Sequence, residues 1–272
     1  MVFFWKLRSK TNSAQMKTLR MFGMALVAII MGVSLSSCNK DENPENDGDV
    51  SNEKKLVKEV WEEDGETITH TYIYDDKGRL VKSTGTSMWN REYIWGDDAI
   101  MSSGETYTIE NGLIQTYGGM TFTYNKSDKL IKIEESYSYT DGTSITTALW
   151  DGDKLVSVSY GNTNVTITYG ESCKKGFNLP YYIILEEPLL TACPELFGMR
   201  TKQLPATITE KSDGFYDTTF GKTFGAYVAT STYTYEFDKD GYISKVTTHY
   251  NIEDKDKNTN TSYTDTVTYI WE

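Results

Sequence analysis

Thr71–Lys82 reads TYIYDDKGRLVK, and this stretch decides the fold. An alternating strand ends in Tyr74, an acidic turn containing Gly78 follows, and a second strand opens with Leu80. An aspartate at the first turn position accepts hydrogen bonds from the amides that follow it. A glycine three places later adopts the left-handed conformation that closes a bulged hairpin. The stretch therefore predicts one β-hairpin.

The same unit recurs along the chain. Clear copies occupy residues 122–132, 149–156 and 235–245, and weaker copies surround Trp95–Asp98 and Glu110–Leu113. Within the strands, aromatic and aliphatic residues alternate with threonines, which predicts one apolar face and one threonine-rich face. We therefore expect an all-β fold: a single large antiparallel, curved sheet or a soluble half-barrel built of repeated hairpins. About 12 to 15 strands of ordinary length fit the chain.

Composition agrees with a β protein and excludes several classes. The chain has 272 residues, with 36 Thr and 20 Tyr beside only 38% hydrophobic residues, a mixture typical of half-buried strands. The formal net charge is -12, so the chain lacks the basic surplus of a nucleic-acid-binding protein. We predict no nucleic-acid partner.

The first residues have the layout of a secretory signal. Residues 1–37 carry five basic groups and no acidic one, and an apolar run of 15 residues extends from Met21 to Leu35. This run is shorter than the ~20 residues that a transmembrane helix needs. Residues 1–15 precede a normal short signal that begins at Met16, so either Met1 or Met16 is the true start. We predict that 1–37 is a signal peptide.

The signal ends in Leu35-Ser36-Ser37-Cys38, which resembles the bacterial lipobox. Lipidation of Cys38 predicts a membrane partner through the N-terminal lipid, because each buried CH2 of an acyl chain contributes ~0.8 kcal/mol. The mature chain then holds 22 basic against 39 acidic side chains, a net charge of -17. Residues 38–53 form a polar, lipidated flexible tether. Its Lys40-Asp41-Glu42 resembles a surface-export signal, which implies an outer-membrane protein exposed at the cell surface; the alternative is the periplasmic face.

Residues 54–272 are predicted to form a single β domain with a helical or loop insertion at 171–205. That insertion holds four of the five prolines. Because proline fits a first helical turn, we expect short helices near Glu187–Ala192 and Pro194–Met199, within about residues 183–200. Cys173 and Cys193 also lie there. An exported protein can pair them in a disulfide, and the alternative is two buried free thiols.

The sequence offers little catalytic material. It has two histidines, His70 and His249, which we interpret as a core and a surface imidazole, and it has no metal-binding spacing or nucleophile motif. We therefore predict no metal, no cofactor and no enzyme activity. The aromatic surplus suggests ligand binding, with Trp89 and Trp95 as candidates, although aromatic pairs also stabilise curved sheets.

Two resemblances add to this interpretation. Tyr74–Leu80 resembles the YD-type repeat of large bacterial surface proteins. The lipobox, the repeated hairpins and the late segment FGMRTKQLPATI at Phe197–Ile208 resemble an exported bacterial lipoprotein family of unknown function with a porin-like fold. The second resemblance implies a curved antiparallel sheet and no assigned activity.

Three hypotheses for function follow. The leading one is a lipid-anchored binding or scaffold module for a glycan, a peptide or another envelope protein. The alternative is a carboxylate-based glycan hydrolase or inhibitor-like module, which requires acids from non-adjacent strands on a concave face. The third is a purely structural envelope subunit. An inner face filled by its own side chains favours a scaffold, whereas an open one favours a binding site.

Overall fold

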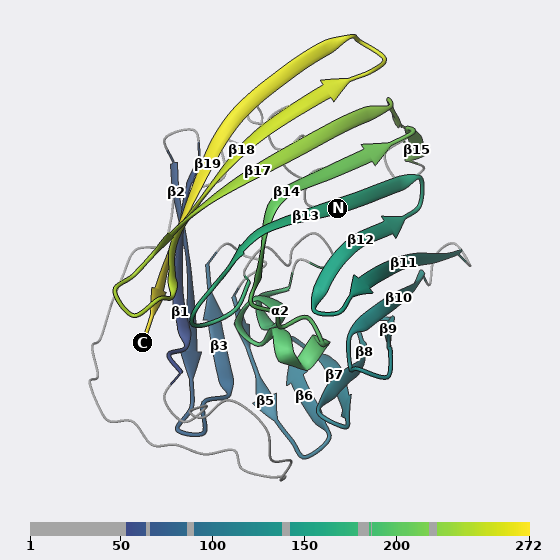
Figure 1. Ribbon diagram of the computed structural model, residues 1–272. Helices are drawn as coiled ribbons and strands as arrows, with labels where there is room; N and C mark the ends of the chain where they lie inside the picture. Colours follow the sequence, from purple (N-terminus) through teal and green to yellow (C-terminus); the bar gives the residue numbers. More distant parts are fainter. Residues whose placement is uncertain are drawn as a thin grey trace, which may run out of the picture.

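The computed structural model describes residues 53–63, 66–85, 90–137, 142–178, 185, 187–217 and 222–272. Figure 1 shows one large sheet that curves around a short helical segment. The strands are β1 Leu56–Glu63, β2 Glu66–Tyr74, β3 Leu80–Thr84, β4 Arg91–Glu92, β5 Ile94–Trp95, β6 Ala99–Ser102, β7 Glu105–Glu110, β8 Leu113–Tyr117, β9 Met120–Tyr124, β10 Leu130–Tyr137, β11 Gly142–Asp151, β12 Lys154–Tyr160, β13 Thr163–Ser172, β14 Gln203–Ser212, β15 Phe215–Asp217, β16 Lys222–Phe224, β17 Tyr227–Phe237, β18 Ile243–Asp254 and β19 Thr259–Trp271.

Seventeen of these strands form one antiparallel, nearly closed sheet, and β15 and β16 form a separate hairpin. Successive strands pair with one another, and β1 pairs with both β2 and β19, which brings the two ends of the β domain together. Tyr93 lies between β4 and β5, and its amide donates to the carbonyl of Val81 on β3. The predicted all-β class and curved antiparallel sheet are confirmed. The strand number exceeds the expected range because several strands, such as β4 and β5, have only two residues.

The predicted faces are also confirmed. On β19, Val267, Tyr269 and Trp271 are buried, whereas the side chain of Ile270 is exposed. The side chain of His70 is buried on the inner face of β2, and that of His249 is exposed. The period of two therefore places most aromatic and aliphatic residues inside the sheet and most threonines outside it, although Thr163 and Thr248 are buried.

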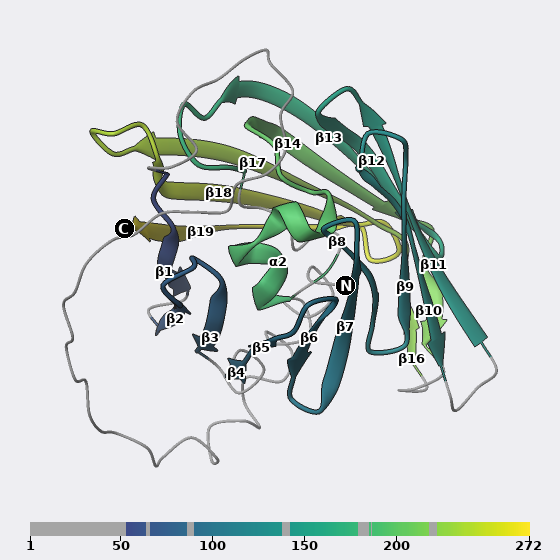
Figure 2. The same cartoon turned by 90° about the horizontal axis from the view of Figure 1, so that it is seen from below.

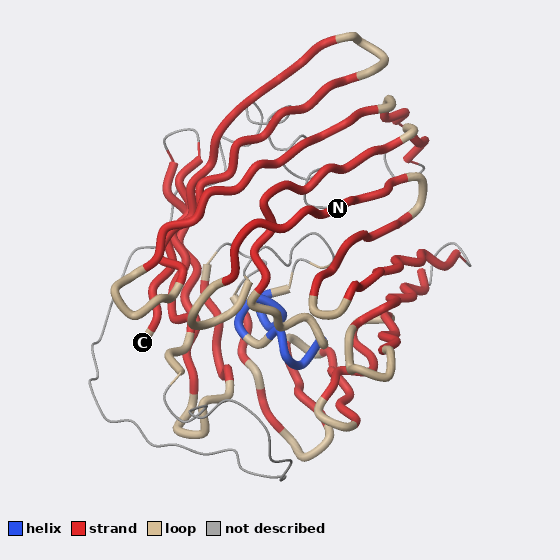
Figure 3. Tube along the Cα trace, viewed as in Figure 1, coloured by secondary structure: helices blue, strands red, loops and turns tan. Residues whose placement is uncertain are grey.

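The insertion forms the two short helices that the prolines predicted. Helix α2 (Pro188–Ala192) and the 3-10 helix η4 (Pro194–Phe197) lie in sequence, with α2 against β3 and η4 against β8. Figures 2 and 3 show this helical segment encircled by strands near one end of the sheet. We call α2 and η4 together the plug. Within the described residues, no helix is long and apolar enough to cross a membrane.

The plug fits tightly against one hairpin turn. Gly198, which ends η4, has a φ of 60°, and a Cβ at this position would lie 2.0 Å from the main-chain oxygen of Asp128. The ring of Phe197 meets Phe122 edge-on at 5.7 Å between centroids. Leu189 and Leu190 are buried in the same core. The plug therefore fills this end of the sheet with side chains.

The repeated turns lie together at the end of the sheet that holds the plug, which we call the turn end. Asp75 accepts hydrogen bonds from the amides of Lys77 and Arg79 at 3.0 and 2.9 Å. Asp238 accepts from the amides of Asp240 and Tyr242 at 2.9 Å each. These bonds show the turn capping that the hairpin pattern predicted.

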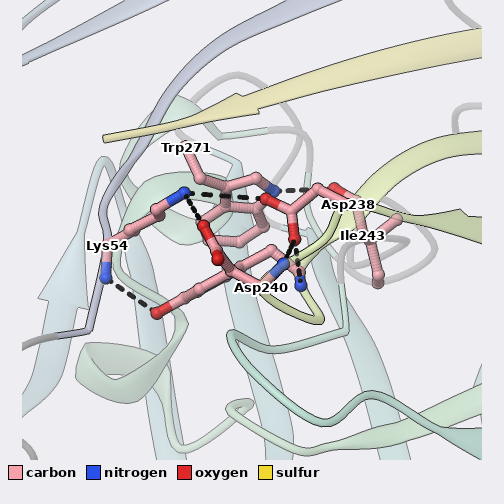
Figure 4. Close-up of polar contacts among 6 residues, drawn as sticks. Lys54, Asp238, Asp240, Ile243 and Trp271 are labelled. Atoms are coloured by element: carbon pink, nitrogen blue, oxygen red, sulfur yellow. Dashed lines mark hydrogen bonds and ion pairs between the residues drawn. The ribbon is translucent and has the colours of Figure 1, made fainter.

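The beginning and end of the β domain are joined at the turn end. The amide of Lys55 donates to the carbonyl of Glu272, and the amide of Glu272 donates to the carbonyl of Lys55. Figure 4 shows the neighbouring Lys54, whose ammonium contacts Asp240 at 2.7 Å and Asp238 at 3.7 Å. The chain that precedes β1 therefore joins the sheet at the turn end.

Aromatic side chains donate hydrogen bonds to main-chain carbonyls where the register of the sheet shifts. A bulge leaves main-chain groups without partners in the ladder, and a buried carbonyl needs a hydrogen bond. Seven aromatic donors satisfy such carbonyls among the described residues, at 2.5 to 2.9 Å: Tyr74 to Leu56, Trp95 to Leu80, Tyr124 to Ile114, Trp150 to Leu130, Tyr169 to Leu155, Tyr235 to Pro205 and Trp271 to Ile243. Each acceptor lies at a register shift.

Candidate functional site

The inner face of the sheet changes from apolar to polar along the strands. Near the turn end it carries Leu80, Ile100, Leu130 and similar buried side chains. Ten buried polar residues of the described strands lie further from that end than the main apolar core, and on β17 and β18 a second apolar cluster of Tyr227, Ala229 and Ile252 lies beyond them. We call these ten residues the polar layer: Glu59, His70, Ser83, Ser102, Thr163, Glu210, Ser212, Ser231, Thr248 and Asp265. The apolar half serves as a structural scaffold, and the polar layer is the candidate binding site.

Tyrosine hydroxyls hold the carboxylates of this layer. Tyr72 donates to Glu59 at 3.1 Å, and the Nδ1 atom of His70 lies 3.4 Å from the same carboxylate oxygen. On the inner face of strands β12 to β17, Tyr160 donates to Glu210 at 3.0 Å, and Tyr227 donates to the same carboxylate. Burial is the main cause that raises the pKa of Tyr72, Tyr160 and Tyr227, so these phenols remain protonated donors at neutral pH.

A second acid–tyrosine cluster forms where the plug meets β4. Glu187 caps α2 by accepting from the amide of Leu189 at 3.3 Å, and it is only 2% exposed. The same carboxylate accepts from Tyr93 at 3.4 Å and lies 3.5 Å from the guanidinium of Arg91. Burial raises the pKa of Glu187, while Arg91 acts in the opposite direction. The carboxylate is therefore buried with a partner of opposite charge.

Two stacked tyrosines extend this cluster onto the next strands. Tyr107 and Tyr117 face each other across β7 and β8, with ring centroids 3.9 Å apart and planes 3° from parallel. Arg91 donates to the hydroxyl of Tyr117 at 2.6 Å. Burial raises the pKa of Tyr117 to about 12. The cluster thus presents one cation, one carboxylate and three phenols on the inner face.

The structure describes only one of the predicted tryptophan and lipidation sites. Trp95 donates to Leu80 and lies under the guanidinium of Arg79, with 5.6 Å between the guanidinium carbon and the ring centroid, so its observed contacts are structural. A ligand-binding role for Trp95 stays a prediction. Trp89 and Cys38, the predicted lipidation site, lie outside the described residues.

The predicted disulfide is not formed in the structure, where Cys173 and Cys193 are both free and buried. The two thiols have different surroundings: the amide of Cys173 donates to the carbonyl of Lys202, whereas Cys193 lies within the plug, between α2 and η4. Burial raises the pKa of the Cys173 thiol to about 11 and raises that of Cys193 further. The alternative of two buried thiols is the observed arrangement.

Sequence reasoning missed Glu187 and Arg91 as partners. The signal for Glu187 is local, because an acidic residue directly before a proline suits the position that caps a helix. The signal for Arg91 is absent from the sequence, since 96 positions of chain separate it from Glu187. The described residues include no group of three or more His, Cys, Asp or Glu side chains arranged to hold a metal ion.

Two solved structures share this arrangement of strands. A porin-like protein from Bacteroides uniformis ATCC 8492 superposes with a TM-score of 0.61 and 19% identity, over 80% of this chain and 98% of that chain. A porin-like protein from Bacteroides vulgatus ATCC 8482 superposes with a TM-score of 0.52 and 12% identity, over 81% and 99%. The chain has a porin-like fold.

The likeness confirms the porin-like fold that the sequence resemblance implied. No family model and no curated protein matches the chain. Membership of a lipoprotein family and the relation to YD-type repeats therefore remain predictions. In this porin-like sheet, the turn end is closed by the plug, and the polar layer lies further along the inner face, with the second apolar cluster beyond it on β17 and β18.

Proposed function

We propose that the protein is a lipid-anchored outer-membrane protein, exposed at the cell surface, that binds a glycan or an envelope protein through the polar layer of its sheet. One observation carries the proposal: buried carboxylates, phenols and hydroxyls gather away from the plugged end. Sugars and peptide backbones are recognised by such groups, because they offer hydrogen-bond donors and acceptors in fixed positions. The scaffold function belongs to the apolar half, where the plug fills the sheet.

The position of the tether supports an orientation in which the polar layer faces away from the membrane. Lys55 and Glu272 are paired at the turn end, so an anchor on Cys38 attaches the domain by its plugged end. The polar layer then lies on the side opposite to the attachment. A ligand in the surrounding medium can meet it without passing the membrane.

The anchoring part is tested by lipid labelling. Cells that express the full chain are fed an alkyne fatty acid, and the labelled protein is compared with the Cys38→Ser variant. We expect label and membrane fractionation for the wild type, and loss of both in the variant. Protease treatment of intact cells then distinguishes the cell surface from the periplasmic face. Label that persists in Cys38→Ser would contradict the assigned site.

The binding part is tested with glycan and peptide arrays probed with the detergent-solubilised lipoprotein. A hit is repeated with Glu210→Gln, which alters the polar layer, and with Asp240→Asn, which alters the exposed turn end. We expect weaker binding only for Glu210→Gln. Equal binding by both variants would place the ligand outside the polar layer, and a blank array would remove the binding proposal in favour of a structural subunit.

The carboxylate-based hydrolase is the second candidate, and Glu187 favours it. A buried carboxyl with a raised pKa is the usual form of a general acid. The inner face also carries acids from non-adjacent strands, Glu59 on β1 and Glu210 on β14. A hydrolase requires that Glu187→Gln abolish release of reducing sugar from a bound glycan. Binding without any release in the wild type would exclude this candidate.

A further inference from the structure

Part of strand β19 lies along an open edge of the sheet, at the end away from the turn end. β18 pairs with β19 from Asp254 opposite Thr259 onward, without a register shift. β1 pairs with β19 only as far as Glu62, which lies opposite Thr266. In the described part of the chain, no strand other than β18 pairs with residues 259–264. Figure 1 shows this part of β19 as the outermost strand, past the β1–β2 hairpin. We call residues 259–264 the open edge.

The main-chain groups that point outward from the open edge follow from the pairing at the other end of β19. The amide of Glu272 donates to Lys55, and the carbonyl of Glu272 accepts from the amide of Lys55. This reciprocal exchange marks a residue whose N–H and C=O both point toward β1, and alternate residues of an antiparallel strand share that direction. Asn260, Ser262 and Thr264 therefore direct their N–H and C=O groups away from β18, toward the side that has no strand.

The open edge lacks the features that protect an exposed strand. Natural edge strands carry charged side chains, a proline or a bulge, which prevent another strand from pairing with them. The open edge reads TNTSYT, with no charged residue and no proline. Its residues are exposed, apart from Tyr263, which is half-buried. An extended segment can therefore add to this edge as a further strand, which is a common mode of peptide recognition.

The open edge is supported from the inner face of the sheet. The ring of Tyr263 stacks on that of Tyr250, with centroids 4.6 Å apart and planes 19° from parallel. Tyr263 also packs against the second apolar cluster. A strand that is already ordered loses little conformational entropy when another strand joins it. The inward side chains of an added strand lie beside Tyr263, which favours aliphatic residues at alternate positions of that strand.

Interface size and charge favour a segment of another protein over a second copy of this chain. A stable interface between two folded proteins takes about 20 to 30 residues from each partner, many more than the open edge offers. Two copies also repel each other, because each full chain has a net charge of -12. Glu62 and Glu66 are exposed beside the end of the open edge that is nearest to β1. A basic residue at that end of the added segment is therefore attracted.

We propose that the open edge of β19 binds an extended segment of another protein, which adds antiparallel to β19 and carries basic residues at its N-terminal end. Every strand pair of the large sheet is antiparallel, and a segment in that orientation runs in the same direction as β1. Its first residues then lie beside Glu62 and Glu66. Its main chain exchanges hydrogen bonds with Asn260, Ser262 and Thr264. The open edge lies outside the polar layer, so this interaction is additional to the proposed function.

Binding is tested on the detergent-solubilised full chain with three labelled peptides, KKVTVTV, VTVTVKK and EEVTVTV, by fluorescence anisotropy. The valines are placed for the inner face and the threonines for the outer face. We expect KKVTVTV to bind most tightly and EEVTVTV most weakly. Glu62→Gln should weaken the binding of KKVTVTV by about threefold, the value of one exposed ion pair. Glu110→Gln, which removes an exposed charge at the turn end, is the control and should leave the affinity unchanged.

Ser262→Pro tests the main-chain contacts of the open edge directly. Proline removes the N–H that points outward, and its ring projects toward the added strand. Because β18 does not use that N–H, Tm should stay near that of the wild type, while the affinity for KKVTVTV falls by about tenfold. Ser262→Ala is the matched control, since it changes the side chain but keeps the N–H, and its affinity should equal that of the wild type. Asn260→Pro repeats the test at a second outward N–H, in case Ser262→Pro lowers Tm.

Four outcomes would overturn the proposal. If no peptide binds the wild type at millimolar concentration, the open edge does not accept a strand. If the wild type and both proline variants bind KKVTVTV equally, the peptide binds elsewhere. Tighter binding of EEVTVTV would contradict the basic character of the segment. Sedimentation velocity should show a monomeric wild type, and a dimer that Ser262→Pro dissociates would assign the edge to a second copy of this chain. Ligand binding by the polar layer is measured separately, through Glu210→Gln on the arrays.

Discussion

The indole nitrogen of Trp95 donates a 2.7 Å hydrogen bond to the main-chain oxygen of Leu80, at the point where the β2–β3 ladder shifts register. Trp150 and Leu130 repeat this relationship at the β9–β10 shift, also at 2.7 Å. A basic side chain covers each indole, Arg79 over Trp95 and Lys129 over Trp150. The repeated aromatic of the hairpin unit is therefore a hydrogen-bond donor that completes the neighbouring bulge.

Trp95→Phe and Trp150→Phe should each lower the free energy of unfolding by about 2 kcal/mol, because they leave a carbonyl unsatisfied while keeping a ring. Chemical denaturation followed by circular dichroism measures the change. Ile94→Val, on the exposed side of the same strand, is the control and should have little effect. Unchanged stability in both tryptophan variants would show that the carbonyls find other partners.

Gly198→Ala should destabilise the protein strongly, because the added Cβ meets the main-chain oxygen of Asp128 at 2.0 Å. Gly112→Ala is the matched control, since Gly112 also has a positive φ, of 78°, but nothing lies within 4 Å of its Cβ position. The control should cost about 1 kcal/mol from backbone strain alone. Gly198→Ala should cost roughly 3 kcal/mol or more. Equal Tm values for the two variants would contradict the tight fit of the plug.

Asp75→Ala should cost about 1 kcal/mol, because it removes the acceptor for the amides of Lys77 and Arg79. Asp76→Ala, at the next position of the same turn, is the control and should leave the unfolding midpoint near that of the wild type. Urea titration of both variants checks this difference. A larger loss for Asp76→Ala would show that the turn is capped differently.

The stability of the protein should depend on pH through Glu187. Burial raises the pKa of this carboxyl in the folded state above its ordinary value of 4.5. The native state then holds the proton more tightly than the unfolded state, so the contribution to stability falls as pH rises above 4.5 toward the folded pKa. Glu187→Gln should lack this fall. Thermal melts from pH 4 to 7 measure it, with the exposed Glu236→Gln as control.

The two thiols should resist modification in the native protein, because Cys173 and Cys193 are buried and burial raises the pKa of both. A thiol reagent should react with them only after denaturation. A reducing agent should leave Tm unchanged. A fall of Tm on reduction would indicate that a disulfide forms after all.

The sequence by itself determined the strands, their faces and the plug. Alternation in TYIYDDKGRLVK specifies which side chains point inward, since the period of a strand is two. Asp75 specifies the turn through contacts within four residues, and Pro188 and Pro194 specify the short helices through their fixed φ. These features depend on local geometry, so single residues predict them.

Only the tertiary structure decided the pairing of β1 with β19, the repair of bulges by aromatic donors and the site beside Arg91. Trp271 and Ile243 meet across 28 positions of sequence, and Tyr93 and Glu187 meet across 94. Such contacts depend on how the sheet curves back on itself and on where the plug enters it, and neither leaves a periodic signal. Composition showed that aromatics and acids are abundant, but only their three-dimensional placement separated structural donors from a candidate ligand site.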